Sequence, residues 1–209
     1  MLPESTRSTR PYERRRTRPI LVTTAVLAVL AVATWVVVLS AVTDGPSSTV
    51  CSTPATGPVA GTELDREALA GITPAAPRDV RFQVLNAGGQ RGQGTLVSAE
   101  LTDLEFGEAA APGNDPAHPD GDLDCIGQMR FGPDGEAGAA TLALALPCVE
   151  LIRDDRGGAV VDVVVGGAFT DVAPGRAARD ALEQLSSPGS EDGAQADPAR
   201  LTEARDGVC

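Results

Sequence analysis

The stretch VLNAGGQRGQG, residues 84–94, marks the point where a strand pattern gives way to a helix pattern. Before it, apolar and polar residues alternate over residues 79–86, which predicts a half-buried strand. After it, apolar residues recur at i, i+4 and i+7 over residues 97–104, which is one face of a helix. The glycines between them therefore form the joint of a strand-turn-helix unit.

A strand, a glycine loop and a helix are also the parts of a phosphate cradle. A Walker A loop requires a lysine, and the chain contains none. The dinucleotide fingerprint GxGxxG does not match glycines at 88, 89, 92 and 94. What remains is a helix N-terminus, a generic anion site, or a tight turn whose glycines supply positive φ and close packing, which we favour. The ligand-binding candidates are Asn86, Gly88, Gly89, Arg91 and Gly92.

The residues that follow the joint contain further strand patterns and helix patterns. The expected elements are a short strand at 106–111, a strand at 126–131, a helix at 134–146, a strand at 159–166 and a helix from 174 to 185. Residues 149–155 are ambiguous. The order β-α-β-β-α-β then α predicts an α+β two-layer domain over residues 79–186, a small sheet with helices on one face.

The net charge of −12 is unevenly distributed along the 209 residues. Residues 1–18 hold six arginines and two glutamates, a net of +4, so the rest of the chain carries −16. An acidic surface repels polyanions, which argues against nucleic acid as a partner. Aromatic residues make up only 3% of the chain, so the core must be mainly aliphatic.

The uncharged segment at residues 20–42 predicts a single transmembrane helix after a basic cytoplasmic tail at 1–19. At helical rise its 23 residues reach about 34 Å, enough for a hydrocarbon core of about 30 Å. A cleaved signal peptide is the alternative, but its apolar region is usually about 7–15 residues. A lipoprotein is another, with Cys51 as the modified residue. We expect a Pro/Gly/Ser/Thr-rich stalk at 43–78 and a disordered acidic tail at 187–209.

All four cysteines fall on the predicted outer side of the membrane, where disulfides persist. We predict a structural disulfide between Cys125 and Cys148, because both lie within the folded part. Cys51 and Cys209 would then be free or paired with one another. No CxxC or Cys/His ligand spacing occurs, so no structural zinc site is expected.

An acidic loop also raises the question of a metal or catalytic site. Its candidate side chains are Asp115, His118, Asp120, Asp122 and Asp124. The aspartates copy the first half of a calcium loop, but the required glycine and final glutamate are absent, so we expect a solvated turn and no metal. The chain has one histidine and no GxSxG elbow, so we expect no catalytic residues, no enzyme activity and no cofactor.

VLNAGGQRGQGTLVSAEL resembles the opening of the LytR C-terminal domain, and VVDVVVGGAF resembles that domain's last strand. The longer pattern NAGGQRGQ, PDGDLDCIGQMRFGPDG, PCVELIRDDR and AARDALEQL is similar to the actinobacterial envelope integrity family. The resemblance implies an anchored, extracytoplasmic protein without an established catalytic role. About 108 residues leave no room for a separate LytR-type phosphotransferase domain.

The functional hypothesis from sequence is an envelope integrity module that binds or scaffolds cell-wall polymer or envelope proteins. The alternative is an enzyme or binding module that acts on phosphorylated cell-wall precursors through residues 86–94. A pure protein–protein adaptor is a third hypothesis, and the sequence does not separate it from polymer binding.

Overall fold

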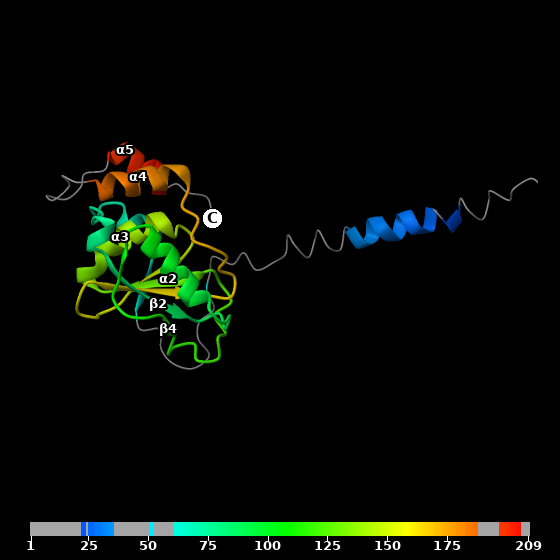
Figure 1. Ribbon diagram of the computed structural model, residues 1–209, viewed down its shortest axis with the longest axis horizontal. Helices are drawn as coiled ribbons and strands as arrows, with labels where there is room; N and C mark the ends of the chain where they lie inside the picture. Colours follow the sequence, from blue (N-terminus) through cyan, green and yellow to red (C-terminus); the bar gives the residue numbers. More distant parts are fainter. Residues whose placement is uncertain (1–21, 24, 36–50, 52–60, 188–196, 206–209) are drawn as a thin grey trace, which may run out of the picture. The chain divides into compact units, whose positions relative to one another are not determined.

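The structure is a computed structural model, and the chain forms two compact units, Met1–Gly45 and Pro46–Cys209. The structure describes residues 22–23, 25–35, 51, 61–187 and 197–205 (Figure 1). In the first unit the described residues are helical, and their apolar side chains are exposed. No helix within this described part has the length and apolar character that crossing a bilayer requires. The predicted transmembrane segment, 20–42, extends beyond the described residues at both ends.

The second unit is built on a mixed seven-stranded sheet in the order β1-β6-β5-β7-β2-β3, with β4 also paired to β2. Strands β7, β3 and β4 run parallel to β2, while β5 is antiparallel to β7 and parallel to β6. The strands are β1 (Thr62–Leu64), β2 (Arg81–Asn86), β3 (Gly107–Glu108), β4 (Gly113–Asn114), β5 (Gly127–Phe131), β6 (Glu150–Arg153) and β7 (Val160–Val165). This sheet with its helices confirms the predicted α+β class.

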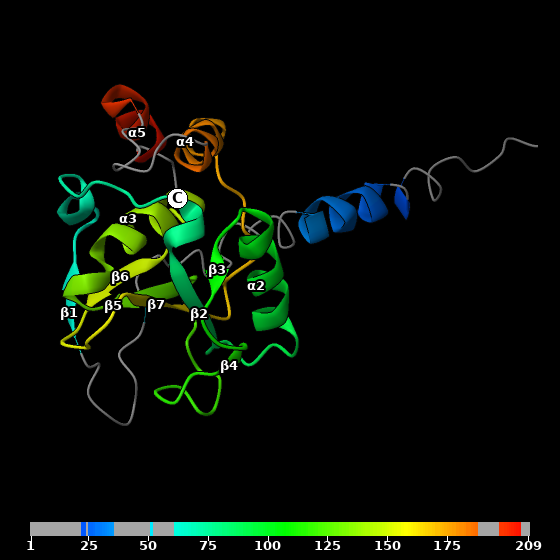
Figure 2. The same cartoon turned by 60° about the vertical axis from the view of Figure 1, so that its left-hand side comes forward.

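The helices pack on one side of the sheet. They are α2 (Gln93–Asp103), α3 (Glu136–Ala145), α4 (Arg176–Ser186) and α5 (Pro198–Arg205). Figures 1 and 2 show α2 and α3 next to the sheet, with α4 and α5 stacked beyond α3. Alternation along β2 directs Phe82 and Val84 to this side, where they belong to the main core, and Leu85 to the other side.

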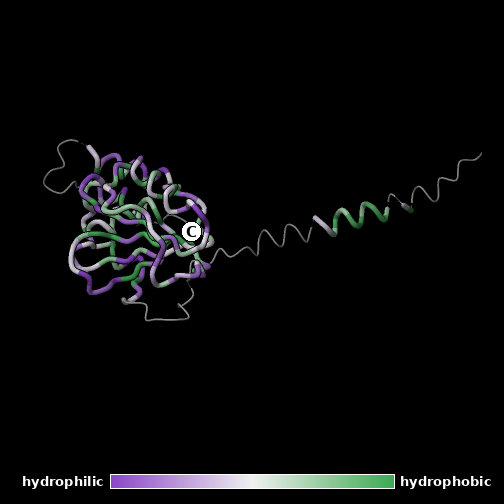
Figure 3. Tube along the Cα trace, turned by 60° about the horizontal axis from the view of Figure 1, so that its bottom comes forward, coloured by the Kyte–Doolittle hydropathy of each residue, from purple (hydrophilic) through white to green (hydrophobic). Residues whose placement is uncertain are grey.

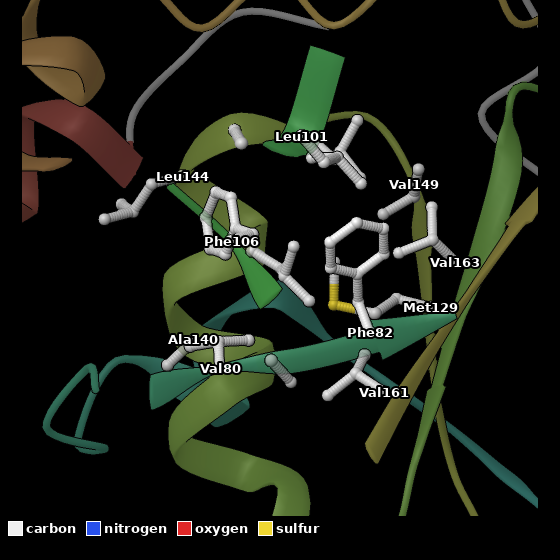
Figure 4. Close-up of a cluster of buried hydrophobic side chains, with 14 of the residues drawn as sticks. Val80, Phe82, Leu101, Phe106, Met129, Ala140, Leu144, Val149, Val161 and Val163 are labelled. Carbon is white, nitrogen blue, oxygen red and sulfur yellow. The ribbon is translucent and has the colours of Figure 1, made fainter. Parts of the chain in front are cut away.

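The main core lies between the sheet and these helices. Phe82, Met129 and Val163 from the strands belong to one buried cluster with Leu101 of α2 and Leu144 of α3 (Figure 4). All five side chains are almost completely buried, which contributes about 1.5–3 kcal/mol for each large apolar side chain. Along the trace, the hydrophobic segments of this unit lie mainly inside it and the hydrophilic ones outside (Figure 3).

Two predicted flanks contain more structure than expected. β1 lies within the predicted Pro/Gly/Ser/Thr-rich stalk and pairs with β6, so the ambiguous residues 149–155 contain a strand. Arg66–Leu69, also within the predicted stalk, forms a 3-10 helix. In the predicted disordered tail, α5 forms a helix that buries Leu201 and Ala204 in the main core. Both segments are short and mostly polar, so their sequence gives only a weak periodic signal. Tertiary pairing stabilises them instead of an apolar periodicity of their own.

Candidate functional site

The glycine turn after β2 is held by the side chain of Asn86. Its Nδ2 donates a hydrogen bond to the carbonyl oxygen of Gln90 at 2.7 Å, and its Oδ1 accepts one from the backbone N–H of Gly88 at 3.2 Å. An asparagine that bonds its own backbone in this way fixes a turn. Asn86, predicted to bind a ligand, therefore uses its amide to shape the loop.

The glycines of the turn serve geometry in different ways. A Cβ at Gly88 would lie 2.4 Å from backbone atoms of both Gly166 and Gly167, so this position requires glycine for close packing. Gly89 and Gly92 have φ values of 72° and 82°, in the left-handed region that favours glycine. The structure thus supports the tight-turn interpretation of residues 84–94.

Backbone hydrogen bonds join this turn to two other segments. The N–H of Ala87 donates to Val165 O of β7 at 2.9 Å, and the N–H of Leu123 in the acidic loop donates to Ala87 O at 3.0 Å. The N–H of Gly167 then donates to Leu123 O at 2.6 Å. Because β2 and β7 are parallel, the junction lies at their shared carboxyl ends, a common place for ligand sites in α/β sheets.

The acidic loop is anchored by a buried ion pair rather than solvated throughout. Both carboxylate oxygens of Asp115 accept hydrogen bonds from the guanidinium of Arg130 at 2.9 Å, and the Asp115 side chain is 0% exposed. Arg130 also donates to Gln128, which donates to Glu150 of β6. The backbone N–H of Asp115 donates to Asn86 O at 2.9 Å, so the pair fixes the loop beside the glycine turn.

The single histidine of the chain is buried in this loop, with 2% of its surface exposed. Its Nδ1 lies 2.9 Å from Oδ1 of Asp122, and this hydrogen bond is the main cause that lowers the pKa of the Asp122 carboxyl. An ionised carboxylate accepts, so Nδ1 of His118 donates in this pair. Its Nε2 is buried and has no hydrogen-bond partner among the described residues. A buried polar atom without a partner costs about 1–3 kcal/mol.

An open hollow with a volume of about 430 Å³ lies between the glycine turn and the acidic loop. This volume falls within the usual range of small-molecule sites, about 300–1,000 Å³. The lining residues are Asn86, Gly89, Arg91, Gly92, Asn114, His118, Pro119, Asp120 and Gly121. The structure thus brings four of the five predicted ligand residues together with the acidic loop, whereas Gly88 lies outside this lining.

Three lining residues, Asn114, Pro119 and Gly121, have no counterpart among the candidates from sequence. Asn114 lies beside Asn86 because β4 pairs with β2 in parallel register. Gly121 lies against Gly89, since a Cβ at Gly121 would be 2.5 Å from the Gly89 Cα. A glycine in a PDG sequence signals a turn, but it does not reveal which distant loop the turn contacts.

The chemistry of the hollow is polar and nearly neutral. Arg91 and Asp120 supply one charge of each sign, and the lining contains no Ser, Thr, Cys or Lys side chain. The hollow therefore offers no hydroxyl, thiol or amine nucleophile. In the described part of the chain, no group of three or more His, Cys, Asp or Glu side chains is placed to hold a metal ion.

The disulfide near this site differs from the predicted one. Cys51 is bonded to Cys125, so the predicted pairing of Cys125 with Cys148 is wrong. Cys125 belongs to the small apolar cluster on the face of the sheet opposite the main core, whereas the neighbours of Cys148, Leu146 and Val149, belong to the main core. Cys148 is also disulfide-bonded, and Cys209 lies outside the described residues.

Comparisons with known proteins agree with this architecture. Residues 79–169 match the LytR cell envelope-related transcriptional attenuator family. The chain is 35% identical over 205 residues to the cell envelope integrity protein Cei of Mycobacterium tuberculosis, covering 96% of this chain and 93% of that protein. It is also similar to the crystal structure of the soluble domain of a conserved hypothetical secreted protein from Mycobacterium marinum. There the TM-score is 0.66 and the identity 35%, covering 73% of this chain and 100% of that one. The chain therefore belongs to the Cei family of cell envelope integrity proteins, with a LytR C-terminal domain at residues 79–169.

Proposed function

We propose that this protein maintains the integrity of the cell envelope as a membrane-anchored, extracytoplasmic and non-catalytic binding module. The observation that carries the proposal is the 35% identity to a cell envelope integrity protein across 96% of the chain. Similarity over nearly the whole length includes the N-terminal segment as well as the domain. The role and the topology are therefore proposed together.

The anchor is supported by the N-terminal sequence and its exposed side chains. Residues 20–42 carry no charge and follow an arginine cluster, which places residues 43–209 outside the cytoplasm by the positive-inside rule. In the described part of this segment, Leu27 is 64% exposed and Trp35 is 69% exposed. Such side chains favour a lipid environment, since the described residues of this unit offer them no protein core.

A binding role is supported by the hollow beside the glycine turn. It lies at the carboxyl ends of β2 and β7, its loops are fixed by the Asp115–Arg130 pair, and its lining has no hydroxyl, thiol or amine nucleophile. Such a rigid polar depression suits recognition of a ligand more than covalent chemistry. The ligand would be a cell-wall polymer or a segment of another envelope protein.

A second candidate function is binding of phosphorylated cell-wall precursors. The exposed guanidinium of Arg91 lies in the hollow beside the glycine turn, and this favours an anion. The carboxylate of Asp120 in the same lining opposes it. Titration of the protein with pyrophosphate-bearing lipids tests the idea, because binding that depends on Arg91 should be lost in Arg91→Ala.

The proposed function is tested by complementation of a deletion strain. The full chain should restore resistance to envelope stress, and a form without residues 1–45, retained in the cytoplasm, should not. A third form with residues 1–45 replaced by an unrelated single-pass anchor should restore resistance, because only tethering is required. Full rescue by the cytoplasmic form would overturn the proposal.

A further inference from the structure

We propose that the hollow between the glycine turn and the acidic loop binds a neutral, polyhydroxylated saccharide unit, with His118 Nε2 accepting a hydrogen bond from a sugar hydroxyl. The inference rests on the proposed envelope function and deepens it by naming the class of ligand.

The hydrogen-bonding state of His118 favours a ligand with hydroxyl groups. The Asp122 carboxylate accepts a hydrogen bond from Nδ1, so in a singly protonated ring Nε2 is the acceptor. Nε2 is buried and has no partner among the described residues, although His118 belongs to the lining of the hollow. A ligand hydroxyl that donates to this atom would satisfy it. A fully ionised phosphate has only acceptors, whereas each sugar hydroxyl supplies one donor.

The charge of the lining favours a neutral ligand. The cation of Arg91 is balanced by the anion of Asp120, and the exposed Asp122 adds negative charge nearby. A phosphate dianion would meet repulsion from these carboxylates. A hydroxyl donates to a carboxylate and accepts from a guanidinium or an amide, so a neutral saccharide satisfies the exposed polar groups of Arg91, Asn114 and Asp120 together.

Hydrogen bonds and close backbone packing hold both walls of the hollow in place. Gly89 and Gly121 pack closely against one another through their backbones. Asp115 is held by two hydrogen bonds from Arg130, and the turn is held by Asn86. A site ordered in advance loses little conformational entropy on binding, which a weakly hydrophobic ligand such as a sugar requires.

The test is calorimetric titration of the full chain in detergent micelles. One probe is a set of neutral pentose and hexose oligosaccharides, a second is vesicles that carry a neutral glycolipid, and a third is inorganic pyrophosphate. We expect saturable binding of at least one saccharide and none of pyrophosphate. Binding of the free oligosaccharide points to a wall polysaccharide as the source, and binding of the vesicles alone points to a lipid headgroup.

Variants assign the binding to the hollow. His118→Asn keeps a donor for Asp122 but removes the Nε2 acceptor, and it should weaken binding about tenfold or more, as expected for one lost hydrogen bond. Asp120→Asn, on the exposed rim, should weaken binding severalfold without disturbing the fold, which keeps the test valid if His118→Asn fails to fold. Asp155→Asn, an equal charge change outside the lining, should bind as the unmodified protein does.

Each contrary result is informative. Pyrophosphate binding without saccharide binding overturns the inference in favour of the phosphorylated-precursor candidate. Absence of saccharide binding by the folded protein, or equal binding by the folded His118→Asn and Asp120→Asn forms, also overturns it. Complementation by the anchored chain is measured separately, so a failure here leaves the proposed envelope function standing.

Discussion

Replacing Gly88 by alanine tests the claim that the glycine turn is a packing joint. The added Cβ would lie 2.4 Å from two backbone atoms and 2.6 Å from a third, all in Gly166 and Gly167. None of these atoms belongs to a flexible side chain, so the ends of β2 and β7 must separate. Overpacking of this kind typically costs about 1–3 kcal/mol, and the purely backbone contacts place Gly88→Ala at the upper end, about 3 kcal/mol.

The assay is urea unfolding of residues 46–209 under non-reducing conditions, which is justified because the matching domain of the M. marinum relative was crystallised by itself. For a domain of this size, about 3 kcal/mol corresponds to a fall of about 6–12 °C in Tm. Gly92→Ala should cost about 1–2 kcal/mol, because its φ is 82° although its surroundings are open. Gly157→Ala adds no close contact and needs no left-handed φ, so it should change the free energy of unfolding by less than about 0.5 kcal/mol. If Gly88→Ala were as stable as Gly157→Ala, the packing argument would be refuted.

Three further predictions concern the stability of the same unit. Peptide mapping should find Cys51 linked to Cys125, and a Cys125 peptide linked elsewhere would contradict the structure. Cys51→Ser should lower the free energy of unfolding by about 4 kcal/mol in the chain-entropy account, for a sequence separation of 74. Arg130→Met should cost about 3–5 kcal/mol in urea unfolding, because it leaves a buried carboxylate unpaired, and an effect below about 1 kcal/mol would show that the pair is not buried in solution. Burial opposes ionisation of Asp154, but the hydrogen bonds and charge of Arg156 outweigh it and lower the pKa of this carboxyl. The resulting stabilisation is present above pH of about 4 and lost as pH falls through the lowered pKa, so Asp154→Asn should show a weaker acid dependence of unfolding than the unmodified unit.

Local patterns in the sequence predicted the elements that carry their own periodicity. The strand and helix on either side of the glycine turn correspond to β2 and α2, and the run of valines corresponds to β7. The helix expected from residue 174 corresponds to α4, whose Ala178, Leu182 and Leu185 are buried. In each case the apolar spacing is set by the face that packs on the core, so the pattern is visible without tertiary knowledge.

The site could not be assembled in the same way, because its parts depend on long-range pairing. Asn114 reaches the hollow only through the parallel pairing of β4 with β2. His118 was identified from sequence, but its burial and its bond to Asp122 depend on how the acidic loop folds back over the sheet. The pairing of Cys51 with Cys125 joins residues far apart in sequence, and cysteine spacing alone leaves such connectivity open.

The most direct measurement of the central claim places His118→Asn at its native locus in the bacterium and records survival under envelope stress. Asp155→Asn serves as a control outside the lining of the hollow, and immunoblotting of membrane fractions confirms equal amounts of both anchored proteins. The account predicts that His118→Asn leaves cells as sensitive as the deletion strain, while Asp155→Asn cells remain resistant. Full resistance with His118→Asn at normal protein levels would contradict the claim that this hollow is where the domain acts.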